Sequence, residues 1–261
     1  MIPSLPLQNK TVMIPRGKAH AKSFSELVAK VGGIPVEIPL IAFRPVAATE
    51  ELHEIINNIH TYDWIIFTSN VTVETLYSFI KKPVDFPKIA VIGDKTRQVL
   101  ENRGVKVDFT PGHYVAEQFF EEFHSHIHKG SRVLIPKGNL ARDYIASSLK
   151  NQGASVDEVV IYETYLPDDS REKLIKMLRT GSLDILTFTS PSTIDHFLEI
   201  VVGHKLQNQI EQCIVACIGP VSMRKAEDWG LTVHAVPEKY TVEEMLKSII
   251  EYLKIHPHTG G

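Results

Sequence analysis

The chain of 261 residues has few features that would tie it to a membrane or to nucleic acid. No apolar run approaches the roughly 20 residues of a transmembrane helix, and the first ten residues hold two prolines in place of the apolar core of a signal peptide. The formal net charge is −3, so no global positive field attracts nucleic acid or an anionic membrane surface. We therefore expect a cytoplasmic monomer with neither of these partners.

Cysteine is also scarce. The only two cysteines, Cys213 and Cys217, lie four residues apart in the apolar segment CIVACIG and face the same way on a strand. A disulfide between them would require the strand to bend, and no further metal ligands lie nearby in the sequence. We expect two buried free thiols, because free cysteine is among the most buried residue types.

Several common motifs of cofactor and hydrolase chemistry are missing. The sequence contains neither GxGxxG nor GxxxxGK[ST], so dinucleotide or P-loop nucleotide binding has no support. GxSxG and HExxH are absent as well. The histidines of HSHIH, His124, His126 and His128, would point to different sides of a helix end, which disfavours a shared metal ion.

The composition is that of a globular protein, with 43% hydrophobic and 23% charged residues. Runs of β-branched and apolar residues alternate with amphipathic helical patterns along the whole chain, which is typical of βα units around parallel sheets. The predicted strands begin at Thr11, Asp63, Ile89, Val107, Arg132, Val159, Asp184, Ile214 and Thr232.

The chain also carries an internal repeat. FTSNVTVETLYSFI from Phe67 aligns with FTSPSTIDHFLEIV from Phe188, 121 residues later. VMIPRG and VLIPKG repeat at the same spacing, and the segments around IAVIG and IVACIG repeat through Gly93 and Gly219 at a spacing of 126. Similar segments at a nearly fixed spacing indicate one structural unit that is present twice.

The order of the repeated segments predicts two lobes, one of which is interrupted. Lobe 1 is expected to comprise residues 1–37 and 170–261, and lobe 2 residues 46–160, with connector strands at 38–45 and 161–169. The predicted fold class is α/β, with two flavodoxin-like or Rossmann-like parallel-sheet lobes joined by a two-stranded β connector. The opening between two such lobes is where a ligand usually binds.

Small polar residues and cations follow the predicted strands, at the edge where doubly wound sheets bind ligands. Helix N-termini at this edge favour anions, and short hydroxyl or amide side chains add donors. The same residue types are also good helix caps, and this alternative stays open. The candidate anion-binding residues are Ser69, Asn70, Thr96, Arg16, Lys137, Arg142, Ser190, Pro191 and Ser222.

Tyr162 is the candidate for chemistry. It lies in VVIYET, where the chain passes from one predicted lobe to the other, and its phenol could donate a proton to a leaving group. A tyrosine packed in a hinge strand is the alternative that position alone leaves open.

These segments, taken in order, resemble the uroporphyrinogen-III synthase family over nearly the whole chain. The resemblance rests on FTSNV, the VIG strand with its following Thr96, VLIPKGN, EVVIYET, FTSPST, CIGP with its following Ser222, and VPEKYTVEEML. It implies a bilobed protein that removes the terminal hydroxyl of linear hydroxymethylbilane as water. It also implies closure of the macrocycle with inversion of ring D, without a metal or organic cofactor.

The resemblance also implies roles for individual residues. Tyr162 matches the tyrosine implicated in loss of the hydroxyl, and Ser69 and Ser190 match serines that contact the substrate. Thr96 and Ser222 match hydroxyl residues of the two lobes, although the family often has threonine where Ser222 stands. Backbone groups would be the main contribution of Asn70, Val71 and Pro191.

Two other functions remain as alternatives. The first is a non-catalytic cytosolic two-lobed protein that binds an anionic small molecule. The second, a flavodoxin-like redox domain, is disfavoured because the sequence lacks a phosphate-binding loop rich in serine and threonine.

Overall fold

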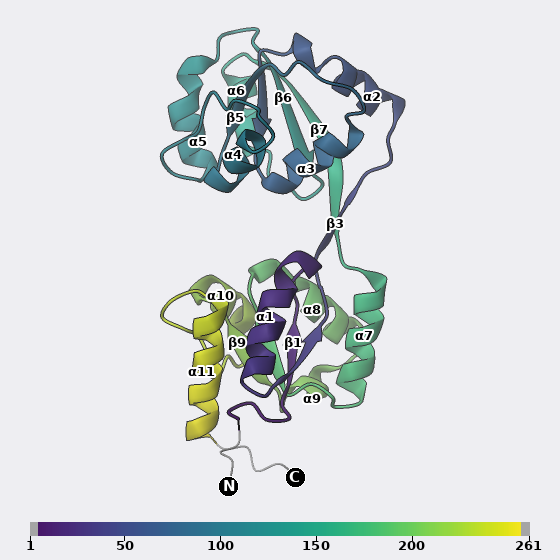
Figure 1. The fold of residues 1–261 in the computed structure, drawn as a ribbon, viewed down its shortest axis with the longest axis vertical. Helices are drawn as coiled ribbons and strands as arrows, with labels where there is room; N and C mark the ends of the chain where they lie inside the picture. The colour runs from purple at the N-terminus through teal and green to yellow at the C-terminus, as the bar shows by residue number, and fades with distance from the viewer. Residues whose placement is uncertain (1–4, 257–261) are drawn as a thin grey trace. The chain divides into compact units, whose positions relative to one another are not determined.

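The computed structural model describes residues 5–256, with all their side chains except those of residues 18–20. The chain forms two compact units: lobe 1 runs up to Ala42 and resumes at Tyr165, and lobe 2 is the continuous segment Phe43–Thr164. In each lobe helices cover both faces of a central sheet (Figure 1). Among the described residues no helix is both long and apolar enough to cross a bilayer.

The sheet of lobe 1 has the strand order β2-β1-β8-β9. These strands are β2 (Ile34–Glu37), β1 (Thr11–Ile14), β8 (Ile185–Phe188) and β9 (Ile214–Cys217), and they run parallel. Every residue of β8 and β9 is buried, as expected for parallel strands covered on both faces. The order corresponds to the start of the flavodoxin-like arrangement 2-1-3-4-5.

Alternate residues of β1 separate the core of lobe 1 into two faces. Met13 packs toward one set of helices, and Val12 and Ile14 pack toward the other. The helices on the Met13 side are α7 (Asp168–Arg179), α8 (Pro191–Gly203), α9 (Gln207–Ile210) and α10 (Pro220–Asp228). Those on the opposite side are α1 (Lys18–Lys30) and α11 (Val242–Ile255).

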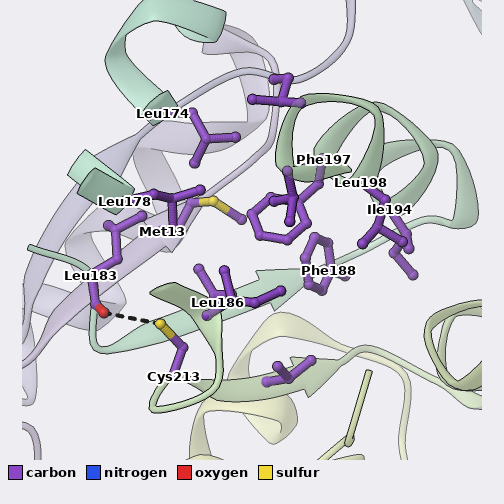
Figure 2. Close-up of a cluster of buried hydrophobic side chains, with 14 of the residues drawn as sticks. Met13, Leu174, Leu178, Leu183, Leu186, Phe188, Ile194, Phe197, Leu198 and Cys213 are labelled. Atoms are coloured by element: carbon purple, nitrogen blue, oxygen red, sulfur yellow. Dashed lines mark hydrogen bonds between the residues drawn. The ribbon is translucent and has the colours of Figure 1, made fainter. Parts of the chain in front are cut away.

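The Met13 face is closed by aromatic and branched side chains (Figure 2). Phe188 of β8 meets Phe197 of α8 edge to face, with ring centroids 5.1 Å apart. Cys213 lies at the margin of this cluster, and its Sγ donates to the Leu183 carbonyl at 3.2 Å. Burial of such rings is a large part of the stability of a domain this size.

Both cysteines are free and buried, which confirms the sequence prediction. Burial raises the pKa of Cys213 to about 11 and that of Cys217 to about 12, and the nearby carboxylates of Asp184 and Glu227 act in the same direction. Neither thiol therefore forms a thiolate readily at neutral pH.

The sheet of lobe 2 has the order β3-β7-β6-β4-β5. Its strands are β3 (Ala42–Pro45), β7 (Ser155–Tyr165), β6 (Arg132–Gly138), β4 (Trp64–Phe67) and β5 (Lys88–Val91). By the internal repeat β7, β6, β4 and β5 occupy the places of β2, β1, β8 and β9. Four strands thus have the same order in both lobes, and β3 is an additional strand in lobe 2. The order along the sequence differs, because lobe 1 begins with β1 whereas lobe 2 reaches the equivalent strand, β6, only after β4 and β5.

Lobe 2 is layered in the same way as lobe 1. One face of its sheet is covered by α2 (Glu50–Asn57), α3 (Asn70–Phe79) and α4 (Asp94–Glu101), and the other by α5 (Ala116–Phe123) and α6 (Tyr144–Asn151). Short 3₁₀ turns occupy Ile59–Thr61 and His124–His126. Phe119 and Phe123 of α5 are fully buried.

Two predicted strands, those beginning at Val107 and Thr232, are wrong. Each segment makes a single parallel bridge, Ala90 to Phe109 and Ala216 to Ala235. In both segments a side chain replaces a backbone carbonyl as the acceptor, which keeps the strand pairing from continuing. The Asp108 carboxylate accepts from the Ile89 N–H, and His234 Nδ1 accepts from the Val215 N–H. A side chain thus takes the donor that a backbone carbonyl would use in a continuing strand.

Candidate functional site

The two FTS segments end their strands with the same backbone geometry. Ser69 precedes α3 with φ −156° and ψ 158°, and Ser190 precedes α8 with φ −159° and ψ 154°. Each serine therefore stands at a helix N-terminus on the carboxyl-end edge of its own sheet, where unpaired backbone N–H groups favour an anion. Asn70 is exposed and Val71 half-buried in the first turn of α3, and Pro191 opens α8.

The two serine side chains differ in what they bind. Ser69 Oγ accepts from the Thr72 backbone N–H at 3.2 Å and lies 2.9 Å from the Thr72 hydroxyl, so it is a helix cap. Ser190 Oγ caps no backbone N–H and lies near the hydroxyls of Ser192 and Thr193, at 3.2 and 3.4 Å. The Ser190 hydroxyl is therefore more available to a ligand than the Ser69 hydroxyl.

Thr96 and Ser222 also lie in equivalent places, in the first turns of α4 and α10. Both are almost fully buried, with 4% and 3% of their surface exposed. Their side chains thus offer little surface to a ligand in this conformation, and their roles in substrate binding stay predictions.

The cation at the end of β6 is held by carboxylates. Lys137 Nζ lies 2.5 Å from Asp143 and 2.7 Å from Glu158, and Glu158 also pairs with Lys150 at 3.2 Å. Desolvation alone would lower the pKa of Lys137, but its hydrogen bonds and charge interactions with Asp143 and Glu158 outweigh this and raise it. Lys137 is therefore a charged lysine whose charge is already compensated.

The other two candidate cations are less engaged. Arg142 is 80% exposed and pairs with Glu117 at 3.9 Å, at the outer limit for an ion pair. Arg16 is half-buried and makes no ion pair within the described residues. Of the three, Arg16 and Arg142 have the most capacity left for a ligand carboxylate.

Tyr162 lies on β7 and is half-buried against the core of lobe 2. Its ring meets Phe43 of β3 edge to face, with centroids 5.7 Å apart and planes at 83°. The phenol oxygen makes no hydrogen bond to any residue that the structure describes. The ring is held on one side by Phe43, which is itself 51% exposed, and the hydroxyl is able to bond a ligand.

Two residues that contact Tyr162 were not predicted from the sequence. Gly138 lies directly under the phenol ring, and Phe43 packs against it. The repeated glycine of IPRG and IPKG was a usable signal for Gly138, because a glycine kept at both copies of a strand end points to a shared backbone turn. No signal in the sequence singles out Phe43, since its contact depends on the pairing of β3 with β7.

Among the side chains that the structure describes, no three of histidine, cysteine, aspartate or glutamate are grouped as a metal site would require. His124 Nδ1 lies 2.6 Å from the Glu121 carbonyl, and His126 packs against the rings of Phe109 and Trp64. His124 and His126 of HSHIH therefore take part in local hydrogen bonding and packing.

Comparison with known proteins shows the family. The model described as "Uroporphyrinogen-III synthase HemD" matches residues 22–247. A putative uroporphyrinogen-III synthase from Methanothermobacter thermautotrophicus is 33% identical over 86% of this chain and 91% of its own length. The uroporphyrinogen-III synthase of Synechococcus elongatus is 29% identical over 95% and 97%.

Solved structures show the same fold. A mutant uroporphyrinogen III synthase from the extremely thermophilic bacterium Thermus thermophilus matches with a TM-score of 0.64 at 17% identity, over 95% of this chain and all of the other. The enzyme from Helicobacter pylori 26695 matches with a TM-score of 0.58 at 16% identity, over 94% and 99%. With the family model spanning most of its length, the chain belongs to the uroporphyrinogen-III synthase family, the hydro-lyases of tetrapyrrole biosynthesis.

Proposed function

We propose that this protein converts linear hydroxymethylbilane to uroporphyrinogen III, with Tyr162 as the general acid. The proposal rests on one observation above all: the Tyr162 ring packs edge to face against Phe43, while its hydroxyl makes no hydrogen bond within the described residues. A phenol in that state is available to the hydroxyl of a ligand.

Loss of the terminal hydroxyl as water requires one proton on the hydroxyl oxygen. As the C–O bond of the hydroxymethyl group breaks, the Tyr162 hydroxyl supplies a proton and the group leaves as water. The carbon that remains is electron-poor and is attacked by ring D, which must turn over before the macrocycle closes. The free α-carbon of ring D releases a proton as the macrocycle closes and the pyrrole is restored, so the Tyr162 oxygen can be reprotonated and one water is lost overall. Since hydroxymethylbilane also cyclises unaided to isomer I, the protein's main contribution is to position the chain for inversion.

The substrate carries acetate and propionate carboxylates, and the carboxyl-end edges of both sheets offer helix N-termini and hydroxyl donors that favour such anions. We assign carboxylate binding to the helix N-termini at Ser69 and Ser190 and to Arg16 and Arg142. Thr96 and Ser222 join this set by their equivalent places in the two lobes, and their burial means that a change of conformation must expose them first. Lys137 belongs to this set by its place in the sequence, but its pairs with Asp143 and Glu158 make it the weakest member. Each lobe in this proposal binds part of the substrate through its own edge.

The test supplies freshly generated hydroxymethylbilane with and without the protein, oxidises the products and separates the uroporphyrin isomers. We expect isomer III only when the protein is present. Tyr162→Phe should lower the rate of isomer III formation on the order of 10²-fold, because a general acid contributes about that much. Residual activity is expected, since binding and positioning survive the substitution.

Tyr144→Phe is the matched control. Tyr144 opens α6 in the same lobe, is 39% exposed and has no role in the proposal. Its variant should keep the wild-type rate. A wild-type rate in Tyr162→Phe would remove Tyr162 from the acid role, and isomer I alone from folded protein would favour the non-catalytic binding protein. A cytoplasmic location and a monomeric state stay predictions.

A further inference from the structure

The pairing of β6 with β7 changes register beside Tyr162. Lys137 pairs with Val160, but the next residue, Gly138, pairs with Tyr162. Ile161 is passed over and stays fully buried in the core. Such a bulge re-aims the side chains that follow it, so Tyr162 faces Gly138 only because of this shift.

The two residues approach so closely that a side chain at position 138 would displace the Tyr162 phenol. A Cβ on Gly138 would lie 2.5 Å from both Cε2 and Cζ of Tyr162 and 2.8 Å from its hydroxyl oxygen. At distances below 3.0 Å something must shift, and here all three atoms belong to the end of the Tyr162 side chain. The φ angle of Gly138 lies outside the left-handed region, so the contact with the phenol ring, and no backbone requirement, opposes a larger residue here.

The first copy of the repeat shows the same turn without the phenol. Gly17 and Ile41 lie 121 residues before Gly138 and Tyr162. Among the described atoms, a Cβ on Gly17 would have the Ile41 carbonyl oxygen at 3.8 Å as its near neighbour, which is ordinary contact. Lobe 1 thus keeps the glycine but lacks the ring that makes a glycine necessary.

We infer that Gly138 and Phe43 are positioning residues, which hold the Tyr162 phenol at the orientation needed for proton transfer. Gly138 lets the ring lie against the strand end, and the Phe43 ring restrains it by an edge-to-face contact. The inference rests on the proposed role of Tyr162 as general acid. It further implies that proton transfer belongs to lobe 2, since Ile41 occupies the equivalent place in lobe 1.

The test is a double-mutant cycle on wild type, Gly138→Ala, Tyr162→Phe and the double variant. Gly138→Ala should lower kcat for isomer III about 10-fold or more while KM stays within about twofold, because a displaced catalytic group loses rate more than binding. In the Tyr162→Phe background the same change should cost less than about twofold, because the hydroxyl that it displaces is already gone.

Two further variants separate positioning from damage to the fold. Gly17→Ala, the matched change in lobe 1, should keep kcat, and as a helix N-cap substitution it should cost about 1 kcal/mol of stability at most. Phe43→Leu, which removes the ring edge and keeps apolar bulk, should lower kcat several-fold, and again only when Tyr162 is present. This second variant carries the test if Gly138→Ala does not fold.

The possible failures are distinguishable. Wild-type protein that makes no isomer III, or a Tyr162→Phe variant that is fully active, would remove the proposed function or the acid role. An active wild type with a slow Tyr162→Phe but an unaffected Gly138→Ala would overturn only the positioning of Tyr162 by Gly138. Losses that multiply in the double variant would do the same, because they would show that the two residues act separately.

Discussion

Equivalent cations of the two lobes have different surroundings. Lys137 and Arg16 lie 121 residues apart at matching strand ends, yet the side chain of Lys137 is only 15% exposed and contacts two carboxylates. The counterpart of Glu158 in lobe 1, Glu37, accepts from the Ser25 hydroxyl and makes no ion pair within the described residues. We therefore expect Lys137 to stabilise lobe 2, and Arg16 to be available to a ligand.

Lys137→Met should lower the free energy of unfolding by about 1 kcal/mol at neutral pH, because Glu158 loses its least exposed partner and keeps only Lys150. Since the fold raises the pKa of Lys137, its contribution to stability is complete below the ordinary lysine value of 10.5 and is lost as the pH rises through the raised pKa of the folded state. The fold lowers the pKa of Asp143, so the contribution of the Asp143 carboxylate to stability is present above the ordinary value of 3.8. It is lost as the pH falls through the lowered pKa of the folded state.

The measurement is urea unfolding of wild type and variant at several pH values. The difference should be constant between about pH 6 and pH 9 and should shrink in acid. Lys150→Met is the control, because Lys150 is 48% exposed and should cost less. Equal stability of wild type and Lys137→Met at pH 7 would show that Lys137 does not stabilise the fold.

At the scale of elements, the two FTS turns present the same backbone with different side-chain bonding. Ser69→Ala removes the oxygen that accepts from the Thr72 N–H, so it should lower stability by about 1 kcal/mol. Ser190→Ala removes no backbone cap, so it should leave stability within about 0.5 kcal/mol and raise KM for the bilane. Thermal unfolding and steady-state kinetics on both variants check this pair.

Thr241→Ala is a control for the capping argument. Thr241 Oγ1 accepts from the Glu244 N–H at the start of α11 in the same way, and it has no proposed contact with substrate. It should lose stability as Ser69→Ala does and keep its KM. If Ser190→Ala behaves like Thr241→Ala, with a stability loss and an unchanged KM, Ser190 is a structural residue.

Elements were predictable from the sequence where local pattern decides them. The strands at Trp64, Ile185 and Ile214 are runs of apolar residues that only a buried parallel sheet accommodates, and the repeat indicated that they come in pairs. The strands expected at Val107 and Thr232 fail because Asp108 and His234 occupy backbone donors, which is a tertiary contact.

The candidate site divides in the same way. Ser69 and Ser190 were expected at helix starts and lie there, because strand-to-helix turns are local. The Gly138 contact with Tyr162 was missed because it depends on a register shift between strands that neither segment encodes alone. The ion pairs of Lys137 were missed for a related reason, since Glu158 lies 21 residues away on the neighbouring strand.

At the scale of the whole molecule, each lobe has cores of its own. Phe197 is fully buried on α8 in lobe 1, and Leu76, 121 residues earlier, takes the same place on α3 in lobe 2. Phe197→Ala should destabilise lobe 1 by about 3–5 kcal/mol, and Leu76→Ala should destabilise lobe 2 by about 2–5 kcal/mol.

Hydrogen exchange resolved by segment tests this prediction. In Phe197→Ala, protection should fall in the described residues up to 42 and from 165 onward, and should persist in 43–164. Leu76→Ala should give the converse pattern. Loss of protection in both lobes of both variants would show that the two cores unfold as one cooperative unit.

The insertion of lobe 2 within lobe 1 has a consequence for biosynthesis on the ribosome. Strand β1 pairs with β8, and the Thr11 N–H donates to the Asp184 carboxylate, 173 residues later in the chain. At about 5–20 residues per second the nascent N-terminal strand waits roughly 10–35 s for that partner. Meanwhile the whole of lobe 2 emerges and can fold, so the apolar residues Val12, Met13 and Ile14 stay without β8 during that time and are open to a chaperone.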